Sequence, residues 1–153
     1  MFKKSIILPA FFPSSMENTP HFLSAIKILK KYDICFIEFY YKGNDKKIIK
    51  EYLISHDIKS IYLGAMAAKQ KNLNLSSSNK KLREKSIQEM KKCINDAYFY
   101  GSSSILVNSG RRPENEKDQI AYEYLRKSLE ELLKYIDKEA KDYKLNLTLE
   151  PGD

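Results

Sequence analysis

The feature that most constrains the fold is a regular alternation of short apolar runs with longer stretches of helical periodicity. Strand-like runs occupy residues 4–8, 34–39, 58–63, 104–107 and 145–150. Apolar residues recur at helical spacing over 20–31, 48–53 and 79–100, and over about 25 residues before the last run. Polar loops are expected at 65–78 and 108–114, Thr19 and Asn79 as helix N-caps, and Gly101 as a helix C-cap. Strands that alternate with helices predict a parallel sheet with helical crossovers, which is an α/β fold.

Two parallel architectures fit this alternation, namely an open doubly wound sheet and a part of a (β/α)8 barrel. The length favours a single domain over residues 1–153, because the chain can build one core but hardly two. The first strand–helix turn, residues 9–15, contains no glycine. This argues against a phosphate-binding loop or a dinucleotide fingerprint at that position.

Charge and cysteine content narrow the class of function. The chain has 27 Lys+Arg against 20 Asp+Glu, but only four of the 27 are arginine and the lysines are mixed with acids. We therefore expect a solvated helix surface and no nucleic-acid partner. The two cysteines predict free thiols in a reducing cytoplasm. No apolar run reaches the ~20 residues that a membrane-spanning helix needs. Residues 1–15 resemble a signal peptide, but the prolines that interrupt their apolar run favour a first strand followed by a loop.

Polar side chains at the carboxyl ends of the expected strands are the candidate site residues, because ligands of parallel α/β folds bind there. Glu38 lies near the end of the second strand, Asn108 ends the fourth and Glu150 ends the fifth. Arg111 follows in the loop and could hold a phosphate or simply be exposed. Phe12 could wall a sugar pocket or pack at the rim of a barrel. A carboxylate at a buried strand end needs a cation or hydrogen bonds, which makes Glu150 the strongest candidate.

Several segments together resemble a known family. They are residues 34–38, 74–87, 97–110, the long fourth helix and 147–151. In order and spacing they are similar to the N-terminal portion of the xylose isomerase-like barrel superfamily, which contains sugar isomerases, sugar epimerases and endonuclease IV. The resemblance implies parallel (β/α) units of a TIM barrel, with about five of its eight strands present.

The resemblance also implies a chemistry. Members bind a divalent metal (Mn, Mg, Co or Zn) through acidic residues and a histidine on strands five to eight. Glu150 occupies the place of the first of these ligands, and in the epimerase branch this glutamate also moves the proton next to the carbonyl. The expected substrate is a small sugar or sugar phosphate. The endonuclease branch uses histidines at the ends of strands three and four, where this chain has Gly64 and Asn108.

The chain holds at most one of the metal ligands that the resemblance implies. We therefore expect a truncated product or fragment that does not bind the metal fully and is inactive alone. Five parallel strands leave two open edges, which favours association, including a homo-oligomer. Two alternatives stay open: a degenerate partial barrel that serves as a binding or assembly module, and an endonuclease IV-like DNA-repair protein.

Overall fold

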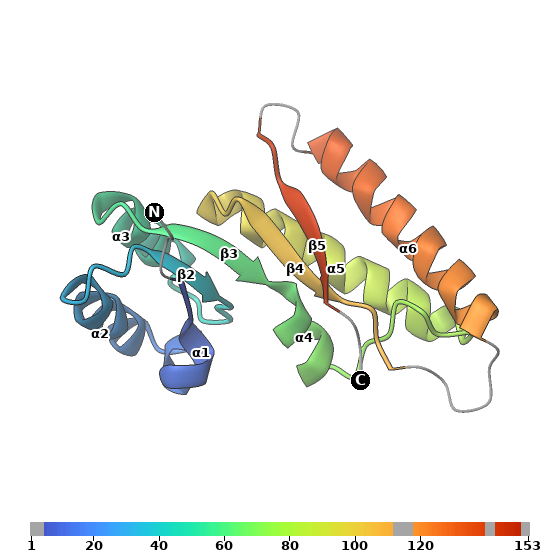
Figure 1. Cartoon of the computed structure of the whole chain (residues 1–153), viewed down its shortest axis with the longest axis horizontal. Coiled ribbons are helices and arrows are strands. Elements are labelled where there is room, and N and C mark those ends of the chain that lie inside the picture. The colour runs from blue at the N-terminus through green and yellow to red at the C-terminus, as the bar shows by residue number, and fades with distance from the viewer. Residues whose placement is uncertain (1–4, 112–117, 140–142, 151–153) are drawn as a thin grey trace.

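The computed structural model describes residues 5–111, 118–139 and 143–150. Five parallel strands form one sheet in the order β1 to β5: Ser5–Ile7, Phe36–Phe39, Lys59–Leu63, Ser104–Asn108 and Asn146–Glu150. The connecting elements are α1 (Leu8–Phe11), η1 (Pro13–Met16), α2 (Thr19–Lys30), α3 (Lys46–Ser55), α4 (Gly64–Gln70), α5 (Lys80–Tyr100) and α6 (Asp118–Glu139). Figure 1 shows this arrangement.

The strand order decides between the two expected architectures. Each strand pairs with the next one along the chain, and the order never reverses as it does in a doubly wound sheet. Helices α2, α3, α5 and α6 contact one another in chain order. Repeated right-handed crossovers in one direction put the helices on one face of the sheet, which is how a (β/α) barrel is wound. The expectation of five barrel-type (β/α) units is therefore confirmed.

The core lies between the helices and one face of the sheet. Alternate residues of β2 and β4 are fully buried there, among them Phe39 and Ile105. Phe39 packs edge-to-face against Phe22 of α2, Tyr62 of β3 and Tyr100 of α5, with ring centroids 5.1–5.6 Å apart. These rings join α2 and α5 to the sheet.

The opposite face of the sheet carries the intervening residues. Glu38, Ile61 and Ser104 are register partners across β2, β3 and β4, and Asn108 pairs with Glu150 at the ends of β4 and β5. Because side chains alternate along a strand, all five belong to the face away from the helices. In a closed barrel this face is the interior.

Local signals at the helix ends are partly confirmed. Asn79 caps α5 by accepting from the backbone N–H of Leu82, and Gly101 ends α5 with φ +70°. The expectation that Thr19 caps α2 is wrong. Asn18 is the cap, and the Thr19 hydroxyl donates instead to Asp45 at 2.7 Å.

The expected loop at 65–78 is also only partly a loop. Its first part is helix α4, which starts directly at Gly64 after β3. The short, alanine-rich sequence of α4 has no apolar stripe, so periodicity did not reveal it. None of the helices in the described ranges is both long and apolar enough to cross a membrane.

Candidate functional site

A cavity of about 470 Å³ lies at the carboxyl ends of β3, β4 and β5. We call it the strand-end cavity. Its polar lining residues are Lys69, Asn72, Asn74, Asn108, Arg111 and Glu150. Figure 1 shows α4, which forms one wall, beside the ends of β4 and β5. Three candidates from the sequence, Asn108, Arg111 and Glu150, therefore line one cavity.

The ladder between β4 and β5 brings Glu150 and Asn108 together. The two residues are direct register partners, so their side chains leave the sheet on the same face. Beyond the strand ends, the backbone N–H of Ser109 donates to the carbonyl of Glu150 at 3.2 Å. The Glu150 side chain is exposed at the end of β5.

Asn74 holds the loop that follows β4. Its side-chain amide donates to the carbonyl of Arg111 at 2.7 Å, and its side-chain oxygen accepts from Ser76. Gly110 donates its N–H to the side-chain oxygen of Asn108 at 2.7 Å. Gly110 has φ +94°, and a Cβ there would lie 2.2 Å from Asn74 Oδ1. Only glycine fits this contact, so the loop has a defined shape.

The two other candidates lie elsewhere. Glu38 shares the helix-free face of the sheet, but its register level is that of Ser104, four residues before Asn108. Glu38 is half-buried and is not a lining residue of the strand-end cavity. Phe12 lies between α1 and η1 and lines a separate cavity of about 260 Å³ with His21 of α2.

Sequence reasoning missed Lys69 and Asn74. Both fall in the segment that was expected to be a loop, where no periodicity assigns a side chain to a face. The positions of these two side chains depend on contacts between segments that are distant in the sequence. Lys69 reaches the cavity because α4 follows β3 without a linker, and Asn74 reaches Arg111 across 37 residues of sequence.

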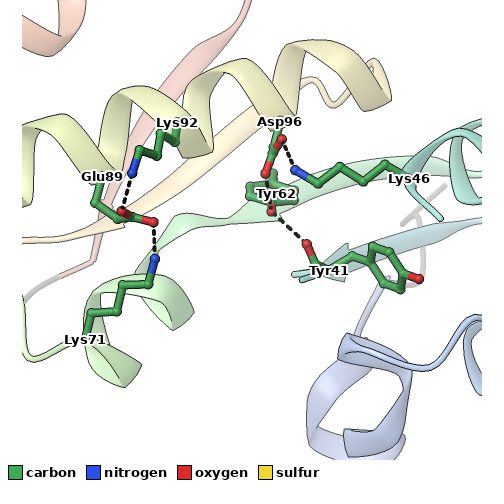
Figure 2. A network of polar contacts seen from close by, with 7 residues as sticks. All are labelled: Tyr41, Lys46, Tyr62, Lys71, Glu89, Lys92 and Asp96. Atoms are coloured by element: carbon green, nitrogen blue, oxygen red, sulfur yellow. Dashed lines mark hydrogen bonds and ion pairs between the residues drawn. The ribbon is translucent and has the colours of Figure 1, made fainter. Parts of the chain in front are cut away.

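A polar network beside the cavity fixes α4 to α5 (Figure 2). Lys71, just after α4, pairs with Glu89 of α5, and Lys92 pairs with the same carboxylate at 3.3 Å. Burial opposes ionisation of Glu89, but the hydrogen bonds from both lysines more than offset it and lower its pKa. This bridge therefore supports the α4 wall of the strand-end cavity.

A second part of the network joins α3, β3 and α5 (Figure 2). Asp96 accepts from Lys46 at 2.6 Å and from the Tyr62 hydroxyl at 3.2 Å. Burial raises the pKa of Tyr62, and the Asp96 charge raises it further. Burial also raises the pKa of the Cys93 thiol to about 12, with smaller contributions from Glu89 and Asp96. The Tyr62 hydroxyl and the Cys93 thiol therefore stay protonated at neutral pH, and both side chains pack between the sheet and the helices.

The donors at the strand-end cavity suit a hard cation in kind but not in number. Carboxylate and amide oxygens are ligands of Mg²⁺ and Mn²⁺. Glu150 is the only carboxylate among the described lining residues. Over the described ranges, no three His, Cys, Asp or Glu side chains gather in a way that could hold a metal. Glu150 can thus supply one ligand of a larger set.

The fold and the cavity define a set of (β/α)-barrel units with a cavity at the carboxyl ends of the strands. Residues 26–152 match the xylose isomerase-like TIM barrel family, and the chain belongs to this family. No curated protein matches the sequence.

Solved structures share the fold at low sequence identity. A D-tagatose 3-epimerase-like protein is 16% identical with a TM-score of 0.71, and the match covers 95% of this chain and 52% of that one. D-psicose 3-epimerase from Clostridium cellulolyticum H10, solved with D-tagatose, is 17% identical with a TM-score of 0.71 and coverages of 94% and 51%. An Anabaena variabilis ATCC 29413 protein, described as a candidate sugar phosphate isomerase/epimerase, is 16% identical with a TM-score of 0.65 and coverages of 96% and 54%. The chain spans about half the length of these structures.

Proposed function

We propose that this chain contributes the first part of the active site of a sugar or sugar phosphate isomerase or epimerase. The reaction is a divalent-metal-assisted proton transfer next to the carbonyl of a ketose or aldose. Family membership supports this proposal, as do the names of the similar structures, two of which are ketose 3-epimerases or resemble one. The rest of such a site would come from further barrel strands, so we expect the chain alone to be inactive.

One observation carries the proposal. The register of β4 and β5 pairs Asn108 with Glu150, and both line a cavity at the carboxyl ends of the strands. A carboxylate in this position can meet the carbon next to a sugar carbonyl. A divalent metal, when bound, would polarise that carbonyl and stabilise the negative charge that develops on it.

The residues of this chain have distinct roles in the proposal. Glu150 is one metal ligand and the base that accepts the proton. The side-chain oxygen of Asn108 already accepts from Gly110, so its NH2 group is the part available to a sugar hydroxyl. Glu38 lies on the same face but farther from the strand ends, level with Ser104. We propose that it contacts the substrate from the interior of the barrel. Phe12 lines a different cavity, and its contact with a sugar stays a prediction.

The experiment is a Mn²⁺ titration of the chain followed by NMR. Paramagnetic Mn²⁺ broadens the amide signals nearest to it, so those of Asn108 and Gly110 should broaden first in the wild type. Glu150→Gln keeps the shape but removes the charge, and we expect it to weaken this binding by about tenfold or more. Glu51→Gln, on the exposed surface of α3, is the matched control. Equal broadening in the Glu150→Gln variant would contradict the proposal.

A second candidate function is a non-catalytic binding or assembly module. Large apolar side chains are exposed at both edge strands and on the flanking elements, among them Ile7 and Phe11 at one edge and Leu149 at the other. Such residues suit contacts with another protein surface. This function would be favoured if Glu150→Gln changed nothing while light scattering showed a stable assembly.

The endonuclease reading is disfavoured by the strand ends. Gly64 and Asn108 stand where that branch would need histidines. For the compartment we propose a reducing one, the cytoplasm. Cys35 and Cys93 are both free thiols, and Cys93 is buried in the core, where oxidation would disrupt packing.

A further inference from the structure

The charge balance of the strand-end cavity is positive. Lys69 and Arg111 line it together with a single described carboxylate, Glu150. A divalent cation at Glu150 would add further positive charge. Two cationic groups beside a low-dielectric wall attract an anion.

These two cations differ from the other basic residues around them. Lys71, two residues beyond Lys69, pairs with Glu89, and Arg126 pairs with two glutamates of its own helix. Within residues 5–111, 118–139 and 143–150, neither Lys69 nor Arg111 has an ion pair or a side-chain hydrogen bond. Among the described residues, the surface acids thus pair with neighbouring cations and not with those of the cavity.

The two cations are carried on defined supports. Lys69 lies in the last turn of α4, whose C-terminal end is bridged to α5 through Lys71. The backbone of Arg111 is bound by Asn74 at 2.7 Å, beside the close contact of Gly110 with Asn74. A cation on a fixed backbone loses less conformational freedom when it binds.

We propose that Lys69 and Arg111 bind the phosphate of a phosphorylated sugar, an inference that rests on the function proposed above. A guanidinium offers a planar pair of donors that matches phosphate oxygens, and an ammonium adds a second point of contact. A cavity of about 470 Å³ lies within the size range of small-molecule sites and is large enough for a sugar phosphate. The phosphate end lies at Lys69 and Arg111, and the carbonyl end lies at Glu150.

The test compares four ligands on the 153-residue chain by NMR titration: D-ribulose 5-phosphate, D-ribulose, inorganic phosphate and gluconate. We expect the sugar phosphate to shift the Gly110 amide signal and to bind at least about tenfold more tightly than D-ribulose. Lys69→Ala and Arg111→Ala should each weaken it by about tenfold. Lys134→Ala on the exposed surface of α6 removes the same charge and should change nothing.

Three results would overturn the proposal: equal binding of D-ribulose and its phosphate, equal loss in Lys134→Ala, or gluconate binding as tight as the sugar phosphate. The last result would assign the site to a sugar acid. Mn²⁺ binding separates this inference from the proposed function. If Glu150→Gln leaves Mn²⁺ binding unchanged while the phosphate effects hold, the metal-assisted function fails and the anion site stands. If Mn²⁺ binding depends on Glu150 and phosphate does not bind, only the anion site fails.

Discussion

Replacing Gly110 by alanine should destabilise the loop that shapes the strand-end cavity. Gly110 has φ +94°, a conformation that costs an L-residue about 1–2 kcal/mol. A Cβ would also lie 2.2 Å from Asn74 Oδ1, 2.5 Å from its Cγ and 2.8 Å from its Cα. Rotation of the Asn74 side chain relieves the first two contacts but not the third, which is backbone.

The magnitude follows from these contacts. Overpacking costs about 1–3 kcal/mol. Movement of Asn74 would also weaken its hydrogen bond to the Arg111 carbonyl, worth about 1 kcal/mol. Together with the strain at φ, we expect Gly110→Ala to lower the free energy of unfolding by about 3–6 kcal/mol.

Gly101 provides the matched control. It has φ +70°, but a Cβ there meets nothing within 4 Å. Gly101→Ala should therefore cost only the backbone strain, partly offset by the reduced freedom of the unfolded chain, or about 1 kcal/mol. The free energies of unfolding of both variants are measured by urea unfolding, with circular dichroism as the signal. They are compared directly where the two unfolding curves have the same m-value. Equal losses in the two variants would refute the argument, because the Asn74 contact would then contribute nothing. Gly110→Ala should also weaken phosphate binding, whereas Gly101→Ala should not.

Three further predictions concern pH and association. The two lysines lower the pKa of Glu89 in the folded state. The ionised Glu89 therefore contributes its full stabilisation above the ordinary pKa of a glutamate, and this stabilisation is lost as the pH falls through the lowered pKa. In Glu89→Gln, the free energy of unfolding should depend less on pH in the acid range. The pKa values of Tyr40 and Cys93 are raised to about 12, chiefly by burial. Their contribution is complete below about pH 9 and is lost as pH rises toward 12, so unfolding free energy should fall over that interval, and constant stability there would contradict the burial argument. Ile7 and Leu149 are 47% and 41% exposed on the two edge strands, so we expect the open edges to associate. Leu149→Lys should then lower the mass found by light scattering, and an unchanged mass would contradict this expectation.

Much of the fold follows from local sequence patterns, but the architecture does not. The five strands and the Asn79 and Gly101 helix ends are readable because they depend on period and on single capping residues. An open sheet and a barrel share the same strand–helix rhythm. They differ in strand order, which is set by contacts between distant segments. Thr19 shows the same limit on a smaller scale: its hydroxyl bonds to Asp45, 26 residues away, and so does not cap its own helix.

The candidate site divides in the same way. The strand-end rule finds Asn108 and Glu150, because both follow directly from where an apolar run stops. It does not find Lys69, whose position depends on α4. Gly64 is buried, and a Cβ there would lie 3.0 Å from the carbonyl of Leu106, so α4 begins in close contact with β4. That approach brings Lys69 to the cavity, and only the packed structure reveals it.

The two faces of the sheet separate stability from chemistry. Val107 faces the helices and is fully buried, whereas its neighbour Asn108 and the partner Glu150 face the other way and are half-buried or exposed. Because strand side chains alternate, substitutions at Asn108 and Glu150 remove little buried apolar area and leave the helix-facing core intact. Val107→Ala, in contrast, removes methyl groups from the core and should cost about 1–3 kcal/mol without touching the cavity lining. Substitutions on the helix-free face can therefore change the lining of the strand-end cavity while the packing of the other face maintains the fold.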